Sequence, residues 1–299
     1  MPLTFARGIL TCVCWTNSTY LVGVKMISQK KRLSGEEGRS SGLEYETSLV
    51  KKFGGKTFSS KKVKSICRKL TTRKADIEIN NTIISVKNPK LSSTSTQVQV
   101  CPYSTFKCYF PDIPSNVEYS LRSFIGDFAD NHKGKENKDH FFMLCEIVGI
   151  KDPQNTLSSE ELRRVRLDSF SLGKDNCDAV VEWLYENREE VYRFIFQDGV
   201  MDPSLERPTK LWWSHKKNDL TNISKFDMSD ILQRARNMDK SEVRFRDEGG
   251  KGKSKKAKNA GTVIQVGAIT IQMKGSGSGA AYHNLQFNCS LNDLNNFMK

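Results

Sequence analysis

Asp76, Ser85 and Lys87 are three polar residues close together in the chain, and their types and spacing could form a catalytic site. Ser85 and Lys87 are two residues apart, so on a β-strand their side chains share one face. If the segment that carries Asp76 pairs with theirs, the three side chains meet across the pair. A carboxylate beside a lysine at a sheet edge suits a divalent metal ion and an activated water. A solvated cross-strand ion pair is the alternative for the same residues.

The sequence around these residues predicts the β-hairpin that the arrangement needs. Ile77 and Ile79 alternate with polar residues, the period of two that is typical of a half-buried strand. Asn80 and Asn81 tolerate positive φ at a tight turn. The β-branched segment 83–87 then returns as the second strand.

Residues 42–53 are predicted to form an amphipathic helix that ends at Gly54 and Gly55. The residues on its apolar side are Leu43, Glu46, Val50 and Phe53. Burying an unpaired carboxylate is costly, so Glu46 on this side indicates a metal ion or another cation as its partner. A position at the margin of the apolar side is the alternative.

The composition is that of a folded, strongly basic protein. The chain has 299 residues, 37% of them hydrophobic, and a net charge of +13. A basic excess of this size favours a polyanionic partner, most often nucleic acid and less often an anionic membrane. No apolar run reaches the roughly 18 residues that span a bilayer, which disfavours the membrane.

The eight cysteines and four histidines show no metal-binding spacing. Cys12 and Cys14 are separated by one residue, and the other cysteines are scattered without a Cys-x-x-Cys pair. A structural zinc site is therefore not expected. Scattered cysteines favour a reducing, cytoplasmic environment.

Two basic regions could contact a phosphate backbone. Residues 51–74 are dense in Lys and Arg, and the spacing of Val63, Ile66, Cys67 and Leu70 predicts a helix with one basic face, or a basic loop followed by a helix. Residues 251–258 form a Lys-rich loop. The candidate DNA-binding residues are Lys61, Lys62, Lys64, Lys255, Lys256, Gln272 and Lys274. Solvated surfaces are the alternative for both regions.

Periodicity predicts the remaining elements. The expected helices cover residues 116–130, 158–169, 175–197 and 227–237, the longest serving packing rather than chemistry. The expected strands cover residues 97–100, 141–150, 209–214, 262–267, 268–274 and 285–288, with 141–150 as a central strand; residues 97–100 could instead start a helix. The C-terminal strands predict a β-hairpin beside a glycine-rich loop.

The order of these features resembles the PD-(D/E)xK nuclease superfamily, and type II restriction endonucleases in particular, over residues 42–103. Gly42-x-x-Tyr45-Glu46 is similar to the family's first-helix pattern. Asp76 takes the place of its metal-binding aspartate, and Ser85-Val86-Lys87 takes the place of its (D/E)xK tripeptide. Residues 269–275 and 285–287 are similar to the C-terminal ends of some restriction enzymes.

The resemblance implies Mg²⁺-dependent hydrolysis of phosphodiester bonds in double-stranded DNA at a specific sequence. Its site residues are Glu46, Asp76, Lys87 and Gln97 as catalytic residues, with Gln99 as the alternative to Gln97, and Glu46, Asp76 and Ser85 as metal ligands. Asp76, Glu46 and the Val86 carbonyl would hold Mg²⁺, and Lys87 would orient or deprotonate the attacking water. The resemblance also implies a cognate DNA methyltransferase as a genetic partner and a homodimer as one oligomeric state.

One position departs from the family pattern, because Ser85 stands where Glu or Asp is usual. Three explanations are open. Ser85 could be a weaker oxygen ligand, Glu78 on the strand face of Asp76 could replace the missing acid, or the activity could have been lost.

The expected fold is α/β, with a mixed central sheet flanked by helices, as in restriction endonucleases, and a C-terminal β-hairpin region. We expect a nuclease core at 26–150 and an extension for DNA recognition at 151–299. Residues 1–25 are expected to be a non-native or disordered leader, since their composition breaks at Met26, the expected start.

Two other functions fit the sequence. A non-catalytic, sequence-specific DNA-binding protein would explain the charge and the serine at position 85, but not an acid on the apolar side of the helix. A structure-specific DNA nuclease would share the catalytic core. RNA binding ranks third, because no paired aromatic motif of the common sheet-type module is present.

Overall fold

The computed structural model describes residues 40–58, 62–67, 70–72, 74–125, 174–202, 205–247, 262–273 and 284–299. Leu43–Lys299 form one compact unit, and the second unit, Met1–Gly42, is described only at 40–42. The expected leader with Met26, the strand 141–150, the helix 158–169 and the loop 251–258 lie outside the described residues.

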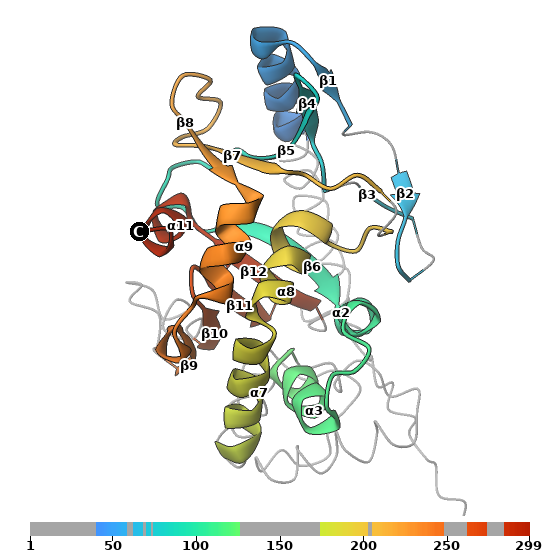
Figure 1. Ribbon diagram of the computed structural model, residues 1–299, viewed down its shortest axis with the longest axis vertical. Coiled ribbons are helices and arrows are strands. Elements are labelled where there is room, and N and C mark those ends of the chain that lie inside the picture. Colours follow the sequence, from blue (N-terminus) through green and yellow to red (C-terminus); the bar gives the residue numbers. More distant parts are fainter. Residues whose placement is uncertain are drawn as a thin grey trace, which may run out of the picture. The chain divides into compact units, whose positions relative to one another are not determined.

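A mixed five-stranded sheet carries the hairpin (Figure 1). Its strands in spatial order are β1 (Lys56–Thr57), β4 (Ile77–Ile79), β5 (Thr82–Lys87), β7 (Lys210–Ser214) and β8 (Ile223–Asp227). β5 and β7 run parallel, while the other neighbours pair antiparallel. Strands from both sides of residue 150 therefore share one sheet.

The β4–β5 hairpin turns at Asn80 and Asn81, as predicted. Their φ angles are 49° and 59°, the left-handed conformation that a two-residue type I′ turn requires at both central positions. Ile77 lies opposite Ile84 across the pair, and both are buried. Since side chains alternate along a strand, the residues next to these isoleucines point to the other face of the sheet.

A helix over residues 40–53 packs on the isoleucine face of the mixed sheet. Tyr45 and Leu49 are its buried residues, whereas Leu43 is exposed. The predicted apolar side was therefore wrong at its N-terminal end, because the large i,i+4 pair of Tyr45 and Leu49 forms the contact. They pack with Ile77, Ile79, Ile84 and Trp212, and with the partly buried Val50 and Phe53.

Gly54 and Gly55 end this helix, as predicted, with φ angles of 77° and 124°. The Gly54 N–H donates to the Val50 carbonyl at 2.8 Å. A Cβ on Gly55 would lie 1.9 Å from the Glu78 carbonyl oxygen, so only glycine allows β1 to leave the helix this close to β4.

A second five-stranded sheet is antiparallel throughout (Figure 1). Its strands in spatial order are β6 (Thr96–Pro102), β12 (Asn284–Cys289), β11 (Ile269–Met273), β10 (Thr262–Val266) and β9 (Val243–Asp247). β10 and β11 form the predicted C-terminal hairpin. β6 pairs with β12, far away in the sequence, and this pairing brings residues 97–100 into a strand rather than a helix.

Helices pack against both sheets. They are α2 (Tyr103–Tyr109), α3 (Ser115–Ile125), α7 (Lys174–Glu186), α8 (Arg188–Arg193), the π-helix η1 (Phe194–Asp198), α9 (Met228–Arg236), η2 (Lys240–Glu242) and α11 (Leu291–Phe297). α2 and η1 contact β6, α3 contacts β11, and α9 contacts β8. The predicted α/β class with a mixed sheet flanked by helices is confirmed. No described helix is long and apolar enough to cross a membrane.

The helix predicted over 175–197 consists of three successive pieces, α7, α8 and η1. The first break lies at Asn187, whose side chain donates to the Trp183 carbonyl at 2.8 Å. The last piece ends at Gly199, which has a φ of 57° and donates its N–H to Phe194 at 2.7 Å. The expected packing role is confirmed by buried aromatic residues such as Phe194, and the abrupt end turns the chain toward β6.

The helix predicted within the basic segment is wrong. A small two-stranded sheet stands there, formed by β2 (Lys62–Lys64) and β3 (Leu70–Thr72). The Ile66 N–H donates to the Val200 carbonyl at 3.1 Å. Backbone partners beyond η1 therefore satisfy this segment in an extended form, and that tertiary contact overrides the local helical spacing.

Strand β7 connects two hydrophobic cores. Trp212 packs against the helix 40–53, while Leu211 and Trp213 enter the main core with the second sheet and its helices. β7 also lies beside β5, with Trp213 opposite Lys87. The end of β5 is therefore anchored by a strand that is buried on both faces.

Candidate active site

A hydrogen-bonded chain joins the three residues that the hairpin was predicted to bring together. The Ser85 hydroxyl donates to Asp76 Oδ2 at 3.1 Å, and Lys87 Nζ donates to Ser85 Oγ at 3.3 Å. Ser85 is fully buried. The serine hydroxyl thus links the carboxylate to the ammonium group across the strand pair.

The backbone of β5 fixes the orientation of the Asp76 carboxylate. The Val86 N–H donates to Asp76 Oδ2 at 2.6 Å, and the Asp76 N–H donates to the Ile84 carbonyl at 2.9 Å. Because Oδ2 already accepts these local donors, the second carboxylate oxygen is the one that can serve a ligand.

Asp76 and Lys87 line a cavity of about 330 Å³ between the hairpin, β6 and the turn after η1. The lining residues are Thr71, Lys74, Asp76, Lys87, Gln97, Val98, Gln99, Val100, Asp198, Gly199, Val200 and Met201. Gln97 and Gln99 of β6 both line the cavity, on either side of a β-bulge in the pairing of β6 with β12. We name this cavity the strand-end pocket.

Lys74 is a pocket residue that the sequence analysis did not identify. Its Nζ donates to the Val98 carbonyl at 3.0 Å and to Gln99 Oε1 at 2.8 Å. Burial, followed by the nearby charge of Lys87, holds the pKa of Lys74 well below its usual value, although Asp76 acts in the opposite direction. An anion bound between the two lysines would raise this pKa, because a nearby negative charge favours the charged form of the amine.

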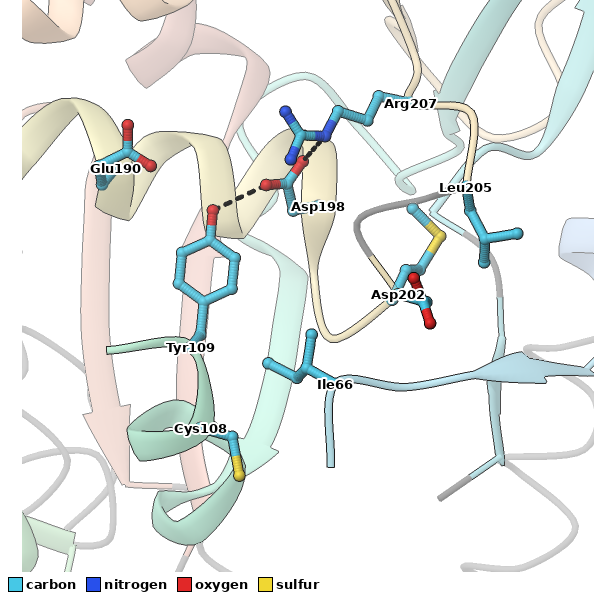
Figure 2. Close-up of a pocket in the computed structure, with 9 residues that line it drawn as sticks. Ile66, Cys108, Tyr109, Glu190, Asp198, Asp202, Leu205 and Arg207 are labelled. Atoms are coloured by element: carbon cyan, nitrogen blue, oxygen red, sulfur yellow. Dashed lines mark hydrogen bonds and ion pairs between the residues drawn. The ribbon is translucent and has the colours of Figure 1, made fainter. Parts of the chain in front are cut away.

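Asp198 lines the strand-end pocket from the opposite side, but other groups already bind its carboxylate. Tyr109 Oη donates to Asp198 Oδ2 at 2.7 Å, and Arg207 Nε lies 2.9 Å from Oδ1 (Figure 2). Burial and the bond to Asp198 raise the pKa of Tyr109. These contacts make Asp198 a structural carboxylate, with its charge balanced by Arg207.

A second cavity of about 310 Å³ also has Asp198 in its lining (Figure 2). Its lining residues are Ile66, Cys108, Tyr109, Glu190, Asp198, Met201, Asp202, Leu205 and Arg207. The two cavities share Asp198 and Met201, which form the wall between them. The wall is formed by the last residue of η1 and the turn that follows it.

The other two candidate acids stand apart from the strand-end pocket. Glu46 is half-buried on the helix 40–53, and the described residues that line the pocket do not include it. Glu78 forms an ion pair with Lys56 at 2.8 Å. Within the described residues, Asp76 is therefore the predicted acid that reaches the pocket.

The predicted DNA-binding residues are only partly described. Lys64 is exposed on β2, and Lys62 lies on the same strand. Gln272 lies on β11 opposite Gln286 of β12. Lys61, Lys255, Lys256 and Lys274 lie outside the described residues.

Magnesium can be tested against the donors that are present. Among the described residues, no three His, Cys, Asp or Glu side chains come together as a metal-binding group. Mg²⁺ does not need such a cage, because one or two carboxylates with waters and substrate phosphates hold it. Asp76 supplies one carboxylate and Gln97 one amide oxygen in the same pocket. This donor set fits a magnesium ion that substrate and water complete.

The residues missed by sequence reasoning are Lys74, Asp198 and Gly199. Lys74 lies among many lysines and arginines, so its type carried no distinguishing signal. The position of Lys74 two residues before Asp76 was the available indication. Asp198 and Gly199 reach the pocket only through the long-range contact of η1 with β6.

Comparisons with known proteins add little. No protein-family model and no curated protein matches the sequence. The crystal structure of the restriction endonuclease MspI in complex with its cognate DNA is similar, with a TM-score of 0.35 and 12% sequence identity. The match covers 72% of this chain and 63% of the MspI chain, so this chain spans less than two thirds of the length of MspI. Similarity at this level carries no inference about function, and membership of the nuclease superfamily stays a prediction.

Proposed function

We propose that the protein is a magnesium-dependent endonuclease that hydrolyses phosphodiester bonds in double-stranded DNA, with the strand-end pocket as its active site. One observation carries the proposal. Asp76 and Lys87 of the hairpin and Gln97 of β6 were predicted for this chemistry, and all three line one pocket. Asp76 is also held by the Val86 N–H and by the buried hydroxyl of Ser85, a restraint that a solvated cross-strand ion pair lacks.

The residues of the pocket have distinct roles in this proposal. Asp76, with Oδ2 held by Val86, offers its other oxygen to Mg²⁺. The ion, when bound, polarises the scissile phosphate and lowers the pKa of a coordinated water. Lys87 orients that water and stabilises negative charge as it develops on the phosphate oxygens.

Ser85 has a definite part in the proposed site although it is not an acid. Its hydroxyl accepts from Lys87 and donates to Asp76, so it sets the separation of the two groups. This role differs from metal ligation, because the hydroxyl is fully buried between its two partners. We infer that Ser85, at the position where the family pattern has an acid, fixes the carboxylate of Asp76 and the ammonium group of Lys87 relative to each other.

The finer parts of the proposal concern specificity and partners. The basic net charge of +13 supports a DNA partner and predicts binding that weakens steeply with salt. Site-specific cleavage of the type II restriction kind would require the region 151–299 to read base edges. Protection of host DNA would then require a cognate methyltransferase, and a homodimer would suit a palindromic site.

A non-catalytic DNA-binding protein is the second candidate function. It would explain why Ser85 stands where the family pattern has an acid. This candidate predicts salt-sensitive DNA binding without cleavage at any magnesium concentration.

The test is cleavage of mixed, unmethylated DNA with added Mg²⁺ by the wild type, Asp76→Asn and Lys87→Met. We expect discrete fragments from the wild type and a rate lower by roughly 100-fold or more in each variant. Chelation of the metal should stop cleavage and leave DNA binding measurable.

Lys210→Met and Asp227→Asn are the matched controls, because these residues form an ion pair in the same sheet but do not line the pocket. Both controls should cleave like the wild type. Cleavage that survives Asp76→Asn and Lys87→Met would place the active site elsewhere. Binding without cleavage by the wild type would support the second candidate.

A further inference from the structure

Lys74 connects the hairpin to the edge strand of the second sheet. It precedes Asp76 by two residues, and its Nζ contacts both the Val98 carbonyl and Gln99 Oε1 on β6. This side chain therefore links the segment before β4 to the second sheet inside the strand-end pocket. The Val98 carbonyl and Gln99 Oε1 each accept one hydrogen bond from Nζ. A lysine side chain can donate both bonds whether it is neutral, with two N–H groups, or protonated, with three.

This contact sets the orientation of the Gln99 amide. An amide has an oxygen that accepts and an NH₂ group that donates, and the hydrogen-bond partners decide which end points where. Lys74 Nζ donates to the amide oxygen of Gln99 at 2.8 Å, so the NH₂ group of Gln99 points away from the lysine. One of its hydrogens points to the Val100 carbonyl at 3.3 Å, and the amide has a second.

The turn after η1 packs closely on the same pair. Gly199 has a φ of 57°, and a Cβ built there would lie 3.4 Å from Gln99 Oε1 and 3.5 Å from Lys74 Cδ. Three segments that are distant in the sequence thus enclose the contact. Gln97, two residues earlier on β6, is exposed. The restraint therefore distinguishes Gln99 from its neighbour.

We propose that Lys74 is a positioning residue that holds Gln99 with its NH₂ group toward the strand-end pocket, where Gln99 donates a hydrogen bond to a phosphate oxygen of the substrate. The inference rests on the proposed function, since a phosphodiester is the ligand. The non-bridging oxygens of a phosphate only accept hydrogen bonds, so an amide fixed as a donor is complementary to them. No proton transfer is required of Gln99 in this role.

Gln99→Glu is the first test. A glutamate keeps an oxygen for Lys74 but replaces the NH₂ group by a second acceptor, which repels phosphate. We expect binding of mixed-sequence duplex DNA, measured with Ca²⁺ in place of Mg²⁺, to weaken by roughly tenfold or more. The melting temperature should not fall, because the carboxylate gains an ion pair with Lys74.

Gln265→Glu is the matched control. Gln265 is also partly buried on a strand, and its Oε1 accepts from Arg244 and Arg246 at 3.2 Å. The substitution changes the net charge by the same amount beside cations outside the strand-end pocket. DNA binding by this variant should stay within about twofold of the wild type, since single surface charges contribute little.

Lys74→Met and Lys74→Arg test the positioning role. Methionine fills the space without donating, so the Gln99 amide is released; KM should rise more than kcat falls, and Lys74→Arg should restore much of the affinity. Combining Lys74→Met with Gln99→Glu should cost less than the sum of the two changes, because both disturb one donor.

The outcomes separate this inference from the proposed function. If the wild type cleaves DNA and Gln99→Glu binds and cleaves equally well, the donor role is wrong and the nuclease proposal stands. If the wild type neither binds nor cleaves duplex DNA, the proposed function fails and this inference fails with it. If Gln99→Glu and Gln265→Glu lose DNA binding equally, the loss is explained by the change in net charge alone. That result would also refute the donor role of Gln99.

Discussion

An aspartate and a lysine come together at two places beside the mixed sheet, and the two pairs differ in how their side chains are held. Lys210 and Asp227 are directly opposite each other on β7 and β8 and form an ion pair with 38% and 46% of their side chains exposed. Asp76 and Lys87 are joined instead through the buried hydroxyl of Ser85. Each pair lines a cavity, so the difference lies in the restraint on the side chains.

The difference shows that residue type and strand spacing alone do not distinguish a surface ion pair from a candidate active site. An exposed pair is solvated and contributes little, since water competes for both charges. A carboxylate held by a backbone N–H and a buried hydroxyl keeps one geometry, which is what a ligand or a metal ion requires. The surroundings of Asp76 supply that restraint, and the surroundings of Asp227 do not.

The largest effect among the following three variants is expected for Ser85→Ala. The change removes the link between Asp76 and Lys87 but leaves the Val86 N–H bound to the carboxylate. We expect DNA cleavage to fall by roughly 10- to 100-fold, as for other residues that orient catalytic groups, with a small loss of thermal stability. Cleavage at the wild-type rate would show that catalysis does not depend on the hydrogen bonds of Ser85. The restraint on Asp76 and Lys87 would then not distinguish them functionally from the exposed pair of Lys210 and Asp227.

Asp198→Asn sharpens the comparison with a third carboxylate, one that lines the same pocket but is bound by Tyr109 and Arg207. Asparagine keeps an acceptor for the tyrosine but loses the charge that balances Arg207. We expect the free energy of unfolding in urea to fall by about 1–3 kcal/mol, toward the lower end because Arg207 is partly exposed. Asp76→Asn should change it less, since the amide oxygen still accepts from Val86.

The opposite ranking of these two variants in stability would contradict the assignment of Asp198 as structural. The cleavage rate per folded molecule provides the second reading. It should fall strongly in Asp76→Asn and only weakly in Asp198→Asn.

The smallest effect is expected for the exposed pair itself. Removing it in the double variant Lys210→Met/Asp227→Asn should lower the free energy of unfolding by about 0–1 kcal/mol, and the difference should shrink further in high salt. Equilibrium urea unfolding at low and high ionic strength measures this. A loss of several kcal/mol would mean that the exposed pair is also a restrained, structural element.

Much of the hairpin could be predicted from the sequence because its determinants are local. Alternating isoleucines next to two asparagines specify a strand, a two-residue turn and a return strand within a few residues. The period of two then places Asp76, Ser85 and Lys87 on one face, which the hydrogen bonds confirm. The glycine pair that ends the helix 40–53 was equally local.

The predictions that failed involved competition between local pattern and distant partners. The spacing of Val63, Ile66 and Cys67 favours a helix, yet this segment is extended because its backbone bonds to residues 200–202. The buried side of the helix 40–53 was chosen by the sheet that it covers. Neither partner can be identified from the spacing of apolar residues, since both are distant in sequence.

The sequence by itself determined the hairpin, its turn and the face that its polar residues share, because each depends on backbone preferences over a few neighbours. Only the tertiary structure decided that this face opens into a pocket, that Lys74 and Gln99 meet there, and that Glu46 does not line it. Those facts depend on β6 pairing with β12 and on η1 packing against β6. Such contacts are set by the burial of a common core, which depends on the whole chain at once.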